Sequence, residues 1–190
     1  VTSIGNRAFK ESALTSITIP ASCTDICAQN KSNDSGAFAE CSALETVIFE
    51  NDENSENSPT VGVGTFYKCT KLTTVELPEG LTNISSSTFR GCTALSKIII
   101  PSAVKNIGEY AFYKNTSLAT VRLGLNVSEI GNFAFYNSWD ENSISAFYVS
   151  AVNPPVIYAN TLPSNLGDYG IKTTVFVPRN SLNLYQEAEF

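Results

Sequence analysis

Cysteine is the residue type with the clearest potential for chemistry in this chain, because three of the five cysteines recur at one position of a repeated motif. Cys41, Cys69 and Cys92 each lie three residues after a phenylalanine. Equivalent side chains on neighbouring turns of a repeat are poorly aimed at each other for a disulfide, so the spacing favours small, buried, reduced thiols. Cys23 and Cys27 lie four residues apart, and the sequence leaves open whether they form a bridge. No disulfide framework defines the fold.

Other catalytic and metal-binding patterns are absent or weak. The chain has no histidine, which removes Ser-His-Asp and Cys-His nucleophiles and His-ligated zinc. Acidic residues gather at Asp52, Glu53 and Glu56 and again at Asp140 and Glu141. Neither group has the ligand spacing of an EF-hand, so a solvated loop is favoured over a calcium site. We therefore expect no cofactor and no metal.

The composition fits one extracellular domain. The 190 residues carry a net charge of −6, and no block of lysine or arginine offers a footprint for nucleic acid. Only 16% of residues are charged, and Ser, Thr and Asn supply much of the polarity, which suits a secreted or cell-surface protein. No apolar run approaches the roughly 18 residues of a membrane-spanning helix. The absence of methionine indicates a removed leader or an excised fragment.

A period of 23 residues organises the chain. Phe66, Phe89, Phe112 and Phe135 keep this step, and two further series keep it as well: Leu72, Leu95 and Leu118, and Ile84, Ile107 and Ile130. Self-similarity at such a period predicts a solenoid, in which each repeat buries its apolar face against its neighbours.

Each repeat predicts a short strand followed by a return segment. In the stretch 95–112, Ile98 and Ile100 have the period of a strand with one buried face. Pro101 follows and cannot donate to a ladder, so pairing ends there. The chain then passes Val104 and Ile107 and reaches a turn whose phenylalanine enters the core from the other side. Strands of successive repeats should stack about 4.8 Å apart in a parallel sheet.

The repeated pattern L-x-x-L-x-L-P-x-x-V-x-x-I-G-x-x-A-F-x-x-C resembles the BspA-type leucine-rich repeat proteins. The resemblance implies a leucine-rich repeat solenoid of the α/β horseshoe class, mostly β, with a right-handed superhelix and little regular helix. Residues 1–152 would form about six repeats, starting in mid-repeat, and 153–190 a C-terminal capping segment of the same domain. That cap would contain a last strand ending at Pro178 and a short helix from about Ser181.

Three polar insertions interrupt the period. They fall at Ala28–Ser35, Asn51–Thr60 and Ser138–Ser143. We expect surface loops that add little to the core, with the first two side by side because they interrupt consecutive repeats. The only tryptophan, Trp139, lies in the third insertion, where it either covers the last repeats or acts as a binding anchor.

The residues between the buried positions of each strand should form two columns on the open face of the sheet. Such a face is either a solvated surface rich in threonine or the binding surface that solenoids commonly use. Ile48, Ile99 and Tyr148 are apolar there, and Lys97 and Arg122 follow Glu76, which argues for binding. The candidate ligand-binding residues are Thr74, Glu76, Lys97, Ile99, Thr120, Arg122, Ala146 and Tyr148, with Trp139 as a secondary candidate.

Three functions compete for this architecture. The first is a non-catalytic binding or adhesion module that recognises a host or microbial surface macromolecule, either an extracellular-matrix protein or a glycan. The resemblance favours it, because BspA-type proteins are associated with attachment. The second is a structural spacer that displays other domains. An enzyme is disfavoured, because only Glu76 among the carboxylates stands on the predicted face. We expect a monomer at the cell surface, secreted or lipid-anchored through a segment outside these residues.

Overall fold

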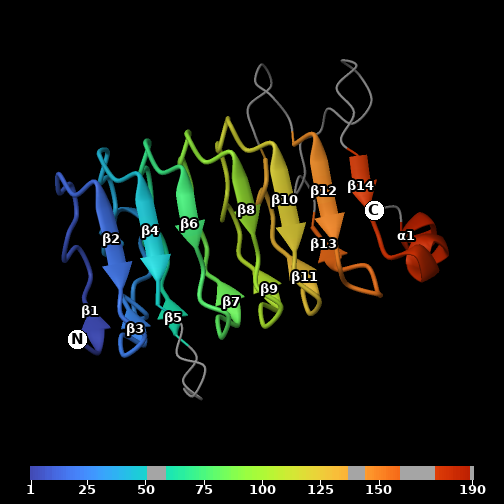
Figure 1. Ribbon diagram of the computed structural model, residues 1–190, viewed down its shortest axis with the longest axis horizontal. Coiled ribbons are helices and arrows are strands. Elements are labelled where there is room, and N and C mark those ends of the chain that lie inside the picture. The colour runs from blue at the N-terminus through green and yellow to red at the C-terminus, as the bar shows by residue number, and fades with distance from the viewer. Residues whose placement is uncertain (51–58, 137–143, 159–173, 189–190) are drawn as a thin grey trace.

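The computed structural model describes residues 1–50, 59–136, 144–158 and 174–188. Its strands form two rows along the long axis of the molecule, with the N-terminus at one end and the C-terminal helix at the other (Figure 1). Every strand pairing within the rows is parallel. The predicted parallel-strand solenoid is therefore confirmed.

Each repeat contributes one strand to each row. The first row contains β2 (Ser16–Ile19), β4 (Thr46–Phe49), β6 (Thr74–Glu76), β8 (Lys97–Ile99), β10 (Thr120–Leu123), β12 (Ala146–Val149) and β14 (Thr174–Phe176). The second row contains β1 (Ser3–Ile4), β3 (Asp25–Ile26), β5 (Thr60–Val61), β7 (Asn83–Ile84), β9 (Asn106–Ile107), β11 (Glu129–Ile130) and β13 (Val156–Ile157). We call each second-row strand, the turn that follows it and the next first-row strand a rung, so β1 and β2 form the first rung, β5 and β6 the third, and β7 and β8 the fourth.

Alternation along the first-row strands sends one side chain inward and the next outward. In β10, Val121 and Leu123 are buried and Arg122 between them is exposed. The pleat of a strand imposes this period of two. Pro20 and Pro101 follow β2 and β8 closely, as expected of residues that cannot donate to a ladder.

The segment between a second-row strand and the next first-row strand forms a third side, which we call the turn edge. Backbone bonds join the turns, for example from the N–H of Phe89 to the carbonyl of Ala111 (2.8 Å). Within one turn, Tyr110 and Lys114 have φ of 57° and 59°, so left-handed residues flank Phe112 on both sides. This tight bend aims the phenylalanine ring into the core.

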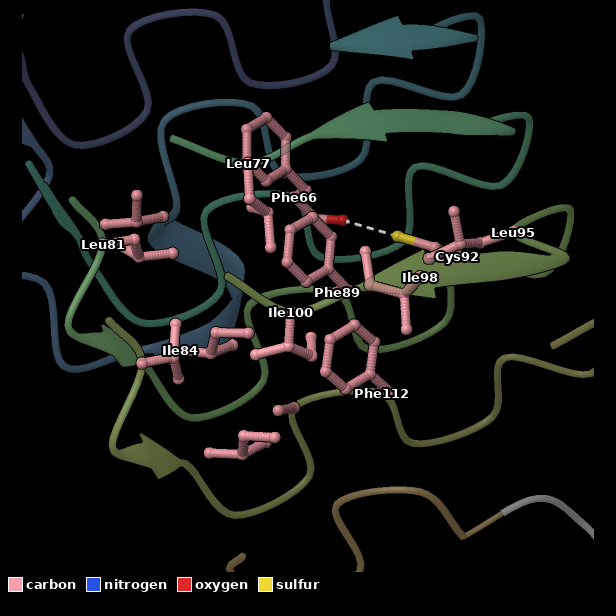
Figure 2. Packing of buried hydrophobic residues seen from close by; sticks show 14 of the residues in the cluster. Phe66, Leu77, Leu81, Ile84, Phe89, Cys92, Leu95, Ile98, Ile100 and Phe112 are labelled. Carbon is pink, nitrogen blue, oxygen red and sulfur yellow. Dashed lines mark hydrogen bonds between the residues drawn. The ribbon is translucent and has the colours of Figure 1, made fainter. Parts of the chain in front are cut away.

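The phenylalanines of successive turns form one continuous stack (Figure 2). Ring centroids lie 5.3 Å apart for Phe89 and Phe112 and 5.1 Å apart for Phe112 and Phe135. The interplanar angles are 11° and 2°. These three rings are fully buried. Around the part of the stack that Figure 2 labels, Phe66 to Phe112, lie leucine and isoleucine side chains such as Leu77, Ile98 and Ile100.

Glycine after a second-row strand allows the rungs to approach closely. A Cβ on Gly108 would lie 2.6 Å from the backbone nitrogen of Ser86, and one on Gly131 would lie 2.7 Å from that of Glu109. Both glycines donate their N–H groups to the preceding rung, to Ile84 and Ile107 respectively, at 2.8 Å. In the repeated Ile-Gly pair, the isoleucine side chain is therefore buried in the core. The glycine that follows lies so close to the backbone of the preceding rung that no side chain fits there.

The cysteine column consists of buried thiols, as predicted. The Sγ atoms of Cys69 and Cys92 donate to the carbonyls of Phe38 and Phe66 on the preceding rung, each at 3.2 Å. Burial raises the pKa of both thiols well above the usual value. All five cysteines are free, so Cys23 and Cys27 are not bridged.

The insertion at Ala28–Ser35 is part of the packed structure, which corrects the expectation of a loop that adds little. Asn30 is 5% exposed, and its Nδ2 donates to the carbonyls of Ser32 (2.7 Å) and Val63 (2.6 Å). A short 3₁₀ helix, η1 (Asn33–Ser35), follows. Because Val63 belongs to the next rung, Asn30 ties the insertion to its neighbour. Residues 51–58 of the second insertion lie outside the described residues, so their predicted proximity to the first stays a prediction.

The C-terminal segment extends both rows and then closes the end of the stack. β13 pairs with β11, and β14 pairs with β12. A 3₁₀ turn, η2 (Arg179–Ser181), leads into the only α-helix of the described chain, α1 (Leu182–Glu187), close to the predicted start. The hydroxyl of the buried Tyr185 donates to the carbonyl of Ala151 at 2.8 Å. The division into a solenoid at 1–152 and a cap at 153–190 stays a prediction.

Replacing Phe112 with alanine should lower the free energy of unfolding by about 3–5 kcal/mol, because the ring is fully buried between two stacked partners. Urea denaturation of the variant and the parent measures this difference. A loss below about 1 kcal/mol would show that the stack contributes little to stability.

Thiol labelling of native protein should be slow at Cys41, Cys69 and Cys92 and complete after denaturation, because the reactive thiolate is disfavoured at buried sites. Mass spectrometry after timed alkylation gives the rate at each cysteine. Rapid native labelling of all three would contradict the buried column.

Candidate functional site

The outward residues of the first row form the two predicted columns. The β10 register pairs Thr120 with Lys97 and Ala146, and Arg122 with Ile99 and Tyr148. On the N-terminal strands, Thr46 pairs with Thr74 and Ile48 with Glu76. One column therefore contains Thr74, Lys97, Thr120 and Ala146, and the other contains Glu76, Ile99, Arg122 and Tyr148, with β6 and β8 adjacent but not paired.

A cation and two aromatic rings form a stack in the second column. The guanidinium carbon of Arg122 lies 4.1 Å from the ring centroid of Tyr148. On its other side, Tyr148 stacks on Phe176 of β14 with centroids 4.5 Å apart and an angle of 9°. Phe176 is 46% exposed, and Ile99, next to Arg122 on β8, is 54% exposed. This column thus presents a preformed apolar and cationic surface over four rungs.

The first row is interrupted between β6 and β8. The row divides into two sheets, one ending at β6 and the other beginning at β8. The N–H of Thr74 donates to the carbonyl of Glu45 (3.1 Å), and that of Thr120 to the carbonyl of Ser96 (3.2 Å). Within the described chain, Lys97 makes no such bond to Thr73. We call this interruption the seam.

A groove of about 580 Å³ follows the seam. Its lining includes four of the predicted binding residues, Thr74, Glu76, Lys97 and Ile99. The opening also exposes part of the core. Val75 is only partly buried, whereas Val47 and Ile98, the inward residues of the strands on either side, are 0% and 1% exposed. The groove has an acidic wall at Glu76 and a basic wall at Lys97.

Ser85 accounts for the seam. It follows β7 at the position that Gly62, Gly108 and Gly131 occupy after their strands, where a Cβ would collide with the preceding rung. The Oγ of Ser85 donates to the carbonyl of Val61 at 2.5 Å, in place of the backbone N–H that glycine offers elsewhere. Cys27 also stands in place of glycine, after β3. It has φ of 43°, and its backbone N–H still donates to the carbonyl of Ile4 on the preceding rung. The side chain of Ser85 therefore holds the two rungs apart, and β5 and β7 are also unpaired.

The seam is open on the strand sides and closed at the turn edge. Across it, Phe66 and Lys68 donate their N–H groups to the carbonyls of Thr88 (2.9 Å) and Arg90 (2.8 Å). Phe66 and Phe89 still stack, with centroids 5.4 Å apart. The opening is therefore wedge-shaped.

A family model described as the BspA-type leucine-rich repeat region matches residues 1–58 and 31–152 in six copies. The chain belongs to this family. No curated protein matches it. The BspA-type repeats thus cover most of the solenoid, including the whole predicted binding face.

Solved leucine-rich repeat structures share the fold of this BspA-type chain. One from Bacteroides ovatus is 22% identical with a TM-score of 0.58, and the match covers 94% of this chain and 46% of that one. A leucine-rich cell-surface protein from Faecalibacterium prausnitzii is 24% identical with a TM-score of 0.52 over 81% and 52%. The pneumococcal vaccine antigen PcpA is 15% identical with a TM-score of 0.63 over 95% and 42%. The chain spans about half the length of these three proteins.

Sequence reasoning on the BspA-type repeats missed two parts of the site. Phe176 was placed in the cap, although a strand ending shortly before Pro178 could have suggested that its side chain continues the outward column. Glu79 joins Glu76 in lining the groove, but it follows Pro78 outside the strand. The secondary candidate Trp139 and the acidic residues Asp52, Glu53, Glu56, Asp140 and Glu141 lie outside the described residues.

Neither a metal centre nor a membrane span is found within the described ranges. They contain no group of three or more Cys, Asp or Glu side chains that could hold a metal ion. In the same ranges, no helix has the length and apolar character needed to cross a bilayer. The outward side of the first row, which we call the strand face, presents Glu76, Lys97 and Arg122 for ion pairing and Tyr148 and Phe176 for aromatic contact.

Replacing Ser85 with glycine should close the seam, because the rungs could then approach as they do at Gly108 and Gly131. In the parent protein, the Lys97 amide should exchange with solvent at least about tenfold faster than the Thr120 amide, since unbonded amides open at little cost. The glycine variant should slow exchange at Lys97. Amide hydrogen exchange followed by NMR measures both sites.

Ser150→Gly is the control for this measurement, because Ser150 is an exposed serine that follows β12, two first-row strands away from β8. Unchanged exchange at Lys97 in the Ser85→Gly variant would show that another residue holds the rungs apart.

Proposed function

We propose that this chain is a non-catalytic, extracellular binding module that engages a macromolecule across several rungs of the strand face. The stack of Arg122, Tyr148 and Phe176 is the observation that carries this proposal. Aromatic and arginine side chains dominate the energetics of protein interfaces. Because these three are already packed against one another, little side-chain entropy remains to be lost on binding.

The extent of the surface favours a large ligand over a small one. Column residues from Glu76 to Phe176 lie on five successive first-row strands, β6 to β14. At about 4.8 Å per strand, they extend over roughly 20 Å. The groove at the seam adds Glu76 and Lys97 as charged groups of opposite sign, which would fix the orientation of a partner. An extracellular-matrix protein or a glycan chain has the required length.

Location at the cell surface is proposed on the same basis. One of the solved neighbours is described as a cell-surface protein and another as a vaccine antigen. The low fraction of charged residues and the abundance of Ser, Thr and Asn suit that environment. We propose a monomeric module, whose stack is covered at its C-terminal end by α1 and the buried Tyr185.

The test uses immobilised fibronectin and a glycan array as probes, with the purified 190-residue chain as analyte. Replacing Lys97, Arg122 and Tyr148 together with alanine should weaken binding to the recognised probe at least about tenfold, because three anchors on adjacent rungs are lost. Circular dichroism should show an unchanged melting temperature within a few degrees, since all three side chains point away from the core.

A control triple variant, Lys105→Ala with Asn106→Ala and Tyr158→Ala, alters exposed residues in or next to β9 and β13 of the second row and should bind like the parent. Equal binding by the strand-face variant would exclude this face as the site. Absence of binding to every probe would instead favour a structural spacer, for which the regular stack is equally suited.

A further inference from the structure

A second surface rich in aromatic residues lies on the turn edge, away from the strand face. It is formed by residues that directly follow the stacked phenylalanines and by residues two positions before them. We call this surface the aromatic edge. All its members are partly exposed: Tyr67, Arg90, Tyr110, Tyr113, Phe133 and Tyr136.

The rings of the aromatic edge form a rigid grid. Tyr110 stacks on Phe133 with centroids 5.2 Å apart and an angle of 1°, and Tyr113 stacks on Tyr136 at 6.0 Å and 12°. Edge-to-face contacts join the two stacks, with Tyr110 and Tyr113 at 5.3 Å and 86°. Each of these four rings is thus held by neighbours both along and across the rungs.

Arg90 closes one end of both stacks. Its guanidinium carbon lies 5.2 Å from the ring centroid of Tyr110, 5.0 Å from that of Tyr113 and 5.9 Å from that of Tyr67. Three rings therefore surround one cation, an arrangement that favours a fixed guanidinium position.

Two of these rings are placed at a backbone position that bulky residues rarely adopt. Tyr110 and Phe133 have φ of 57° and 56°, where the corresponding residues of two earlier turns are Gly64 and Ser87. The tight turn imposes this conformation, but it does not require an aromatic side chain. Bulky residues in left-handed conformations are found mainly where the surrounding structure compensates, often at ligand sites.

The cations of this region lack carboxylate partners. Lys68 lies over Tyr67 at 5.1 Å and Lys114 over Tyr113 at 5.5 Å. In the described part of the chain, neither these lysines nor Arg90 has a carboxylate within 4.0 Å. At the N-terminal turns, by contrast, the cations have carboxylate partners. Arg7 contacts Asp34 (4.0 Å), and Lys10 contacts Glu11 and Glu40 (3.4 Å each).

A hollow of about 480 Å³ continues the aromatic edge toward the N-terminal end. Lys31, Arg90, Glu109 and Tyr110 line it, together with small polar residues. Its two cations outnumber the single carboxylate of Glu109. The aromatic edge is therefore a positively charged surface on a protein with a net charge of −6.

We propose that the aromatic edge binds an acidic, extended segment of a partner protein. Tyr110 and Tyr113 each stack on the ring of the next rung, and the guanidinium carbon of Arg90 lies 5.2 and 5.0 Å from their centroids, so these two rings offer little free face for stacking on sugar rings. Their ring edges, which carry the positive part of the quadrupole, lie beside the cationic groups. These groups attract carboxylates. Lys68, Arg90 and Lys114 lie on three successive rungs, about 10 Å in all, which three or four residues of extended chain would span.

This proposal does not depend on the strand face as the primary site, because the two surfaces share no residue. The experiment selects binders to the purified chain from a phage-displayed library of random peptides about twelve residues long. The expected winners are enriched in Asp and Glu. A fluorescent synthetic copy of the leading peptide then gives dissociation constants by anisotropy, and raising NaCl from about 50 to about 300 mM should weaken its binding.

Arg90→Ala should weaken peptide binding at least about tenfold, and the double variant Lys68→Ala with Lys114→Ala should weaken it as well without altering any ring. Lys105→Ala removes an exposed cation next to β9 of the second row and should have no effect. The strand-face variant with Lys97, Arg122 and Tyr148 replaced should also bind the peptide normally, which separates this proposal from the preceding one.

Three results would overturn the proposal. The first is a set of selected peptides that is not enriched in Asp and Glu. The second is an acidic peptide that binds both turn-edge variants as well as the parent. The third is binding of heparin that depends on Arg90 when no peptide is recovered, which would assign the surface to an acidic polysaccharide.

Discussion

The distance between successive rungs is the constraint on which the structure depends. Parallel strands repeat at about 4.8 Å, and flat aromatic rings stack at a similar separation. The phenylalanine stack, with centroids 5.1 to 5.4 Å apart, therefore fits the spacing that the backbone ladders impose. Residues at one repeat position consequently form a column that runs along the solenoid.

The cysteine column shows that thiol and amide side chains at the same repeat position differ in how well their polar atoms are paired. Cys69 and Cys92 satisfy carbonyls of the preceding rung inside the core. Asn115 occupies the same position one rung later, and its Oδ1 accepts from the N–H of Cys92 at 3.0 Å. Its Nδ2 is buried without a partner in the structure. Thiols suit this column because they bury little polarity, whereas the amide nitrogen of Asn115 brings two N–H donors that stay unpaired.

Periodicity made the columns predictable from the sequence, because each inward or outward position recurs in phase. The Phe series, the thiol column and the pairing of Arg122 with Tyr148 follow from counting residues. The seam does not, since Leu72 and Leu95 keep the usual 23-residue step across it. Its cause is the Cβ of Ser85. The effect of that atom depends on how closely neighbouring rungs approach in space, which the number of residues between repeat positions does not show. The aromatic edge was missed for a related reason: its rings belong to turns, which a search for strand alternation does not sample.

The wedge shape of the seam has a mechanical consequence. In a linear array, stability is the sum of contributions from each repeat and from each interface between neighbours. The interface between the third and fourth rungs has lost both strand ladders and retains the turn-edge bonds, the Phe66–Phe89 stack and the hydroxyl of Ser85. The blocks on either side should therefore behave as two cooperative units joined by a flexure along the turn edge. Tension along the axis would concentrate at that joint, and the strand face could widen or narrow there while each block keeps its internal packing.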